Sequence, residues 1–122
     1  MDEWLREAKS APNSELCGMY LFHRGQVRST AKAQVRENAA SKPVAGLLLS
    51  HDEKKLSAAL ERARAMQGIY YVRVWLAEGE LEVGDDIMQV LVGGDIRPNV
   101  VAALEALVDE LKTNCLEETE LF

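Results

Sequence analysis

This sequence has few of the residues that hold metals or cross-link chains. Its 122 residues include two cysteines, Cys17 and Cys115, and two histidines, His23 and His51. The cysteines lie far apart and form no CxxC pair, so the expected compartment is a reducing, cytoplasmic one. Zinc sites commonly have three or four converging protein ligands, and neither histidine has a cysteine or carboxylate at ligand spacing in the sequence. We therefore expect no metal and no cofactor.

Long apolar runs are also missing. None approaches the ~20 residues of a membrane helix, and the opening MDEWLREAKS has no apolar core typical of a secretory signal. We therefore expect no membrane partner. The chain is 48% hydrophobic and 28% charged, as in soluble globular proteins, and its length predicts a single domain over residues 1–122. Neither a P-loop nor a dinucleotide-binding fingerprint is present.

Positive charge is scarce and unevenly placed. The net charge is −6, yet the segment from His23 to Arg36 carries four cations and no acid, which leaves −10 for the remaining residues. Nucleic-acid binding needs a wide basic face, so we expect no nucleic-acid partner. A small anionic ligand fits one local basic segment better. The alternative is a solvated loop whose charges only aid solubility.

Hydrophobic periodicity predicts an α+β fold, with a mixed or antiparallel sheet covered by helices. We expect a short helix in an N-terminal extension (1–15), a long basic loop (23–43) and an acidic tail (114–122). Asp52 is expected to cap a helix, and Pro98 to open the last one. Strands are predicted at 17–22, 44–49, 69–76 and 87–92, and the apolar stripe of the last helix at Val101, Leu104, Val108 and Leu111.

Basic residues follow or end several of these elements. Arg24 and Arg28 follow the first strand, Arg97 precedes the last helix, and Lys112 ends it. If they converged, they would form a pocket for an oxyanion or phosphate. Gly93 and Gly94 lie before the same helix, where free backbone N–H groups favour an anion, although Asp95 could already occupy those groups as a cap. Lys112 could equally well only complement the helix dipole.

Several motifs together resemble the large, catalytic subunit of molybdopterin synthase. GMYLFHRGQVR is similar to the family's strand-and-loop motif, with matches at Phe22, Gly25, Val27 and Arg28. GLLLSH resembles its next strand and matches at His51. GELEVGDDIMQVLV, residues 79–92, and VDELKT, residues 108–113, resemble two further motifs. By its resemblance, VDELKT aligns Lys112 with an active-site lysine of the family. Arg97 aligns with the arginine of the family's His-Arg pair.

The resemblance implies an α/β hammerhead fold and a homodimer. It also implies a small ubiquitin-like subunit whose C-terminal Gly-Gly thiocarboxylate enters a pocket of the large subunit. Two sulfurs pass in turn to cyclic pyranopterin monophosphate, which forms the dithiolene of molybdopterin. By this resemblance Lys112 and Arg28 are expected to be catalytic. Arg97, Arg24, Phe22 and His51 are expected to bind the substrate or its anionic group.

This sequence also departs from the family pattern. A second active-site lysine is expected near Thr119, but the chain reads NCLEETELF there, with Glu117, Glu118 and Glu120 around that position. Ile96 stands where the histidine of the His-Arg pair would be. Two interpretations follow: a divergent, active enzyme, or a non-catalytic relative that binds the small subunit or a pterin.

Overall fold

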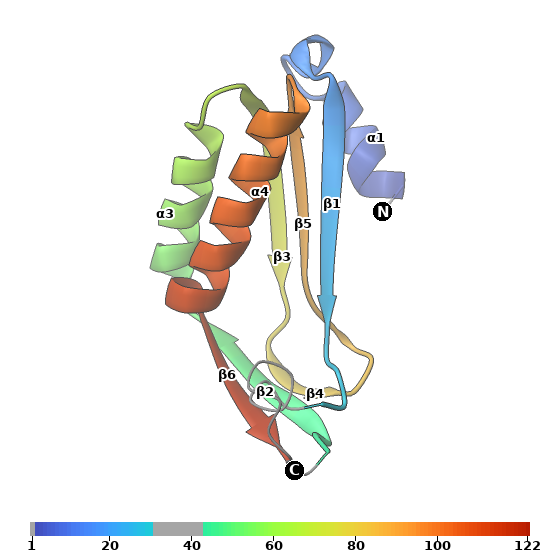
Figure 1. Cartoon of the computed structure of the whole chain (residues 1–122), viewed down its shortest axis with the longest axis vertical. Helices are drawn as coiled ribbons and strands as arrows, with labels where there is room; N and C mark the ends of the chain where they lie inside the picture. Colours follow the sequence, from blue (N-terminus) through green and yellow to red (C-terminus); the bar gives the residue numbers. More distant parts are fainter. Residues whose placement is uncertain (1, 31–42) are drawn as a thin grey trace.

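The computed structural model describes residues 2–30 and 43–122. Lys32, Arg36 and Lys42 of the predicted basic loop lie outside the described residues. Three α-helices, two short helical turns and six strands make up the described chain (Figure 1). They are α1 (Asp2–Ser10), η1 (Ser14–Leu16), β1 (Met19–Gln26), β2 (Gly46–His51), α3 (Glu53–Arg64), β3 (Ile69–Leu76), β4 (Gly79–Glu82), β5 (Asp86–Gly94), α4 (Arg97–Glu110), η2 (Leu111–Cys115) and β6 (Leu116–Leu121).

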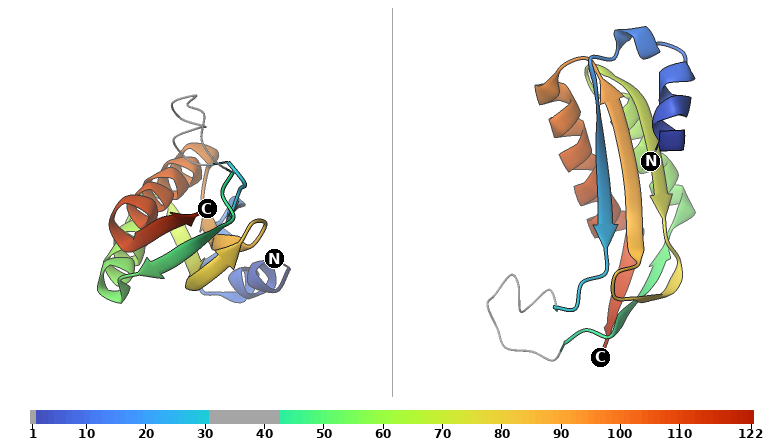
Figure 2. Two further views of the ribbon diagram at one scale, coloured as in Figure 1. Left: turned by 90° about the horizontal axis from the view of Figure 1, so that it is seen from below. Right: turned by 90° about the vertical axis from the view of Figure 1, so that its right-hand side faces the viewer.

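The strands form two antiparallel three-stranded sheets. The larger sheet has the order β1-β5-β3 and the smaller one the order β4-β2-β6. Helices α3 and α4 cover one face of the larger sheet, and α1 lies on its other face (Figure 2). The predicted α+β fold, with helices over an antiparallel sheet, is confirmed, although the strands divide into two sheets.

The ends of these elements follow from local chemistry. The carboxylate of Asp52 accepts a hydrogen bond from the backbone N–H of Lys55 at 3.0 Å, so Asp52 caps α3 as predicted. Gly68 has a positive φ of 75° in the turn between α3 and β3, a conformation that a side chain would strain. Strand β3 begins and ends at the predicted residues.

Two segments differ from the prediction. Residues 23–26 continue β1 instead of starting a loop, because Arg24 and its neighbours pair with β5. Residues 116–121, expected within an acidic tail, form β6 and pair with β2 along its length. Glutamate side chains can alternate with buried ones on such a strand, so acidic composition does not exclude pairing.

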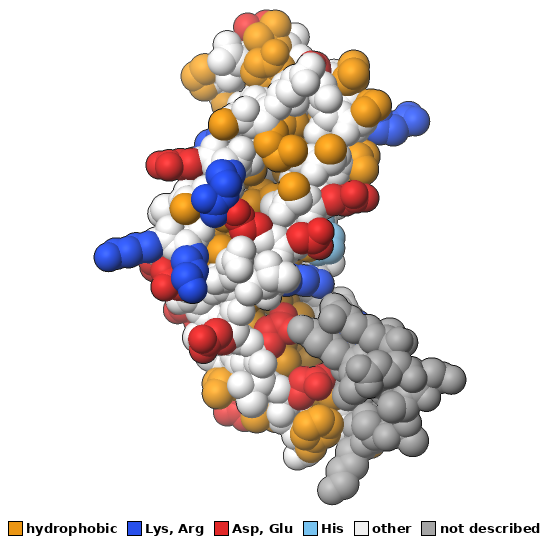
Figure 3. Space-filling model, turned by 60° about the vertical axis from the view of Figure 1, so that its left-hand side comes forward, with side chains coloured by type: hydrophobic (Ala, Val, Ile, Leu, Met, Phe, Trp, Pro, Cys, Tyr) orange, Lys and Arg blue, Asp and Glu red, His pale blue; other side chains and the backbone are white. Residues whose placement is uncertain are grey.

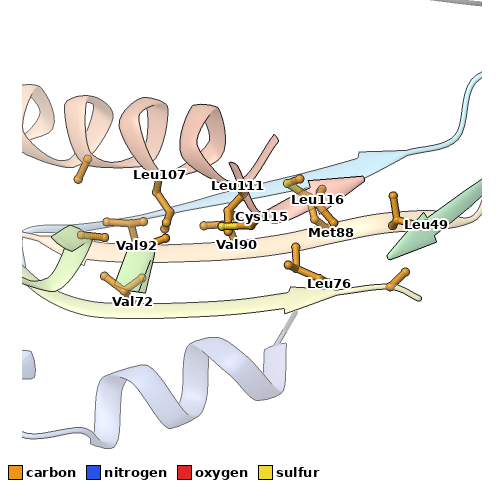
Figure 4. Close-up of a cluster of buried hydrophobic side chains, with 14 of the residues drawn as sticks. Leu49, Val72, Leu76, Met88, Val90, Val92, Leu107, Leu111, Cys115 and Leu116 are labelled. Atoms are coloured by element: carbon orange, nitrogen blue, oxygen red, sulfur yellow. The ribbon is translucent and has the colours of Figure 1, made fainter. Parts of the chain in front are cut away.

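The core lies between α3, α4 and the larger sheet, and it extends toward the smaller sheet (Figure 4). Met88, Val90 and Val92 of β5 are fully buried. In α4 the most buried positions are Val100, Ala103 and Leu107, followed by Leu111, so the predicted stripe is off by one residue for three of its four members. Leu104 and Val108 still pack against the core, which makes the apolar face of α4 wide.

No helix within residues 2–30 and 43–122 is both long and apolar enough to span a bilayer.

Candidate functional site

A cavity of about 90 Å³ lies where the two sheets meet. It takes residues from β1, β2, β5 and β6 and from the connections that follow β1 and α4. Its lining is Gly25, Gln26, Val27, Arg28, Thr30, Val44, Leu47, Ile87, Met88, Lys112, Glu118 and Glu120. The two residues predicted to be catalytic, Arg28 and Lys112, are therefore on the wall of one cavity.

Arg28 stands on a firmly held piece of backbone. The N–H of the preceding Val27 donates to the carbonyl oxygen of Asp85 at 2.9 Å, and the carbonyl of Val27 accepts from the N–H of Gly84 at 2.8 Å. The Val27 side chain is only 3% exposed, so it anchors the residue next to the arginine in the core. Arg28 itself is exposed, and its Nε donates to the carbonyl of Thr30 at 3.0 Å. A guanidinium has four further N–H donors beside Nε, which can hold a ligand.

Lys112 is placed by a change of helix type. Helix α4 ends at Glu110 and continues as a single π-helical turn, Leu111–Cys115, before β6 begins. Both ends of that turn are buried, with Leu111 fully so and Cys115 2% exposed. Single π turns often occur at functional sites because they redirect one side chain. Here the turn leaves Lys112 exposed on the cavity wall.

Two carboxylates line the same cavity. Strand β6 alternates, so Glu118 and Glu120 share a face with the buried Leu116, while Glu117 and Thr119 lie on the other face. The pairing register sets Glu118 opposite Leu49 and Glu120 opposite Leu47. The cavity therefore combines two cations with two acids above an apolar floor.

His23 is a neighbour of this cavity that the sequence analysis did not select. Its ring lines a hollow on α4 with Leu104 and Val108, and its buried Nε2 has no hydrogen-bond partner within the described part of the chain. Burial, and next the positive charge of Lys112, lower the pKa of His23 below its ordinary value. The signal that could have found it is strand alternation, because His23 shares a face of β1 with Gly25, which lines the cavity.

Phe22 and Arg24 point to the opposite face of the larger sheet. The Phe22 ring meets the Trp4 ring of α1 edge to face, with centroids 6.3 Å apart. The guanidinium of Arg24 lies 5.6 Å from the Phe22 ring centroid, and its Nε is 3.6 Å from the carboxylate of Asp86. Neither residue lines the cavity.

Arg97 lies at the far end of α4 from Lys112. The helix has 14 residues, which corresponds to roughly 21 Å at 1.5 Å per residue. Beside this helix start, Asp95 accepts from the side chain of Asn99 at 2.9 Å and from the N–H of Ile96 at 2.6 Å, and these hydrogen bonds lower the pKa of Asp95. Ile96 is itself the N-cap residue of α4, and no described side chain caps the helix. Asp95 thus takes one backbone N–H here, but it is not the cap that the sequence suggested.

His51, the remaining predicted residue, lines a separate hollow with residues such as Lys55 and Glu117. Its ring lies between the carboxylates of Glu53 and Glu78. The structure thus brings together Arg28 and Lys112 and leaves Arg97, Arg24, Phe22 and His51 elsewhere.

Comparisons with known proteins identify the family of this chain and similar folds. Residues 2–114 match the family model described as MoaE protein. The fold is similar to molybdopterin synthase from Staphylococcus aureus, with a TM-score of 0.72 and 18% identity over 88% of this chain and 77% of that one.

Two further solved structures are similar. Molybdopterin cofactor biosynthesis protein E from Burkholderia multivorans has a TM-score of 0.73 and 23% identity, over 99% of this chain and 75% of that one. A protein-protein complex of subunits 1 and 2 of molybdopterin-converting factor from Helicobacter pylori has a TM-score of 0.68 and 17% identity, over 98% and 76%. No curated protein matches this chain significantly. The family match spans most of the chain, and this chain therefore belongs to the MoaE protein family.

Proposed function

We propose that this chain is the large subunit of a molybdopterin synthase. It would transfer sulfur from the C-terminal thiocarboxylate of a small ubiquitin-like subunit to cyclic pyranopterin monophosphate. The observation that carries the proposal is that Arg28 and Lys112, far apart in sequence, line one cavity. Membership in the MoaE family supports a role in molybdenum cofactor biosynthesis.

The two cations suit the charges of this reaction. A thiocarboxylate is an anion, and its sulfur first bonds to a carbon of the substrate. Water then attacks the carbonyl carbon, and the tetrahedral oxyanion so formed breaks its C–S bond, which leaves the sulfur on the substrate and a carboxylate on the small subunit. Fixed cations beside that oxygen stabilise the developing charge, which is commonly the largest single contribution to catalysis. The arginine fork can hold a phosphate or carboxylate through two donors, and the lysine supplies a compact charge. Neither role requires a metal or a nucleophile from this chain.

The size of the cavity limits what enters it. Complete drug-sized ligands occupy pockets of roughly 300–1,000 Å³. A cavity of about 90 Å³ instead suits an end group, such as a thiocarboxylate or a phosphate. We infer that the reacting ends meet in this cavity while the rest of both partners lies outside it. A small-subunit partner is supported by the Helicobacter pylori structure, which is a complex of subunits 1 and 2 of molybdopterin-converting factor.

A second candidate function rests on Glu118 and Glu120. They line the same cavity, close to the position where the family pattern has its second lysine, which favours a non-catalytic relative that binds the small subunit or a pterin. The homodimer and the cytoplasmic location stay predictions. Because Arg97 lies a helix length away from Lys112, it could reach a substrate held by Lys112 only in a second copy of the chain.

A reconstituted turnover assay tests the proposal. The protein is mixed with a thiocarboxylated small subunit and cyclic pyranopterin monophosphate, and molybdopterin is detected as its fluorescent oxidation product. We expect product well above a control that lacks this chain. If no product forms while a standard large subunit is active with the same reagents, the enzyme proposal fails and the binding function is the better one.

A further inference from the structure

His51 lies where β2 ends, and its ring is held between two acids. Its side chain is only 6% exposed. The Nε2 atom lies 2.6 Å from Oε1 of Glu53, a good hydrogen-bond distance, and Nδ1 lies 3.3 Å from Oε1 of Glu78. Glu53 opens α3 and Glu78 precedes β4, so three separate parts of the chain meet at this imidazole.

The two sides of the ring differ in their bonding. In the tautomer that carries its N–H on Nε2, the imidazole donates to Glu53 across 2.6 Å. Nδ1 then presents a lone pair toward a carboxylate oxygen, and this buried atom has no hydrogen-bond partner among the described residues. A lone pair facing an anion is repulsive unless a positive charge lies between them. The arrangement therefore calls for a cation at Nδ1.

A metal ion fits this gap better than a proton does. Although Nδ1 and Glu78 are close enough, they do not meet the geometry of a hydrogen bond. Two ligands that each lie about 2.1 Å from a zinc ion at a tetrahedral angle are roughly 3.4 Å apart. The 3.3 Å between Nδ1 and Oε1 matches that separation. An ion so placed lies to one side of the line that joins the two donors.

Glu53 would orient the imidazole ring through its contact with Nε2, the ring nitrogen that does not bind the metal. Histidines that bind metals usually donate their other N–H to a carboxylate, which fixes the tautomer and orients the ring. The Nε2 contact with Glu53 is of this kind. The side chains of Glu53 and Glu78 are 77% and 67% exposed, so water can complete the coordination from the side of Glu78, although Nδ1 itself is buried.

We propose that His51 Nδ1 and Glu78 form a binding site for a divalent metal ion of the zinc type, with Glu53 orienting the imidazole. The site lines a different hollow from the Arg28–Lys112 cavity, so it is independent of the proposed sulfur transfer. Metal bound there would tie the end of β2 to the β3–β4 connection. An imidazole ligand favours Zn²⁺ over Mg²⁺.

Titration of chelator-treated protein with ZnCl₂, followed by calorimetry, tests the site. We expect one Zn²⁺ per chain and no detectable heat with MgCl₂. Glu78→Gln should weaken Zn²⁺ binding at least tenfold, and Glu53→Gln should weaken it by roughly tenfold through the lost orientation. Glu80→Gln, an exposed acid two residues further on, is the matched control and should bind as the wild type does.

Nitrogen NMR of the His51 ring in the wild-type protein gives a second readout that does not require a variant to fold. Added Zn²⁺ should shift the Nδ1 signal while Nε2 stays protonated. Two results would overturn the proposal: Zn²⁺ binding unaffected by Glu78→Gln, or no Zn²⁺ binding at all. In the second case the two glutamates hold the imidazole without a metal.

Discussion

At the residue scale, the described lining of the cavity carries charges of both signs. Arg28, Lys112, Glu118 and Glu120 all line it, together with the apolar side chain of Leu47. A phosphate-bearing substrate is attracted by the first pair and repelled by the second. Any affinity for an anion is therefore the difference between two opposing contributions, each strengthened by partial exclusion of water.

Removal of one acid should therefore tighten substrate binding. In Glu118→Gln or Glu120→Gln the KM for cyclic pyranopterin monophosphate should fall several-fold, with a smaller change in kcat. Glu117→Gln is the control, because Glu117 lies on the other face of β6. Steady-state kinetics measures the effect. A KM that stays constant or rises would contradict the expected repulsion.

His23 makes the stability of the protein depend on pH. Its native pKa is lowered by burial and by Lys112, so the unfolded chain binds more protons below about pH 6.5. The free energy of unfolding is therefore highest above pH 6.5, where His23 is neutral in both states, and it decreases as the pH falls toward the native pKa. The free energy of unfolding should decrease less between pH 7.5 and pH 5.5 in His23→Phe than in the wild type. Urea denaturation at both pH values checks this, and equal decreases would contradict it.

At the element scale, the segment from α4 through η2 to β6 builds one wall of the cavity. Leu111 is fully buried at the start of the π turn, directly before Lys112 (Figure 4). Cys115 at the other end is also buried, and burial is the main cause that raises the pKa of its thiol. The cysteine thus belongs to the core, and the turn is pinned at both ends.

Leu111→Ala should therefore lower both stability and turnover. Large-to-small changes at fully buried leucines cost about 2–5 kcal/mol in the free energy of unfolding. Leu48→Ala, at a leucine of β2 that is 48% exposed, should cost less than ~0.5 kcal/mol. Chemical denaturation compares the two variants. Similar losses in both would show that Leu111 does not anchor the turn.

Local patterns predicted some elements well. Alternation of apolar residues located β3 to its exact ends, and Asp52 marked the start of α3. The wide apolar face of α4 shifted the predicted stripe by one residue. Strand β6 escaped prediction because its three glutamates are typical of a solvated tail, whereas its pairing depends on β2, which lies far away in sequence. Periodicity carries no information on such a distant partner.

The candidate site was predictable only in part, for the same reason. The resemblance selected Arg28 and Lys112, and the fold brings these two together. It also selected Arg97, but a whole helix separates that residue from Lys112. The group of His51, Glu53 and Glu78 was missed because Glu78 approaches the histidine from a distant turn.

At the scale of the whole molecule, the two ends of its long axis differ in their elements and in their surface side chains. The end with the cavity joins both sheets, while the other end holds η1 and the start of α4 (Figure 1). Hydrophobic side chains gather at that second end, whereas acids and bases are interspersed along the helical face (Figure 3). Leu16 and Ile96 are 49% and 57% exposed there, next to Arg97. Exposed apolar residues of this kind are compatible with the predicted homodimer.

If Arg97 serves the cavity of a second copy, activity should reappear in mixed dimers. Arg97→Ala and Lys112→Ala should each be impaired alone. After mixing and subunit exchange, half of the dimers are heterodimers with one intact site, so activity should recover to about a quarter of the wild-type value. Turnover of the mixture measures this, with the dimer checked by ultracentrifugation. If no activity recovers on mixing, Arg97 does not serve the cavity of a second copy.

The rate of molybdopterin formation by Lys112→Ala tests the central claim most directly. Loss of one fixed group that stabilises an oxyanion commonly lowers kcat by about 10²–10³-fold. We predict a decrease of that size, while Lys54→Ala, an equal loss of charge on the exposed face of α3, leaves the rate unchanged. A Lys112→Ala protein that is folded and turns over at the wild-type rate would contradict the assignment of this cavity as the site of sulfur transfer.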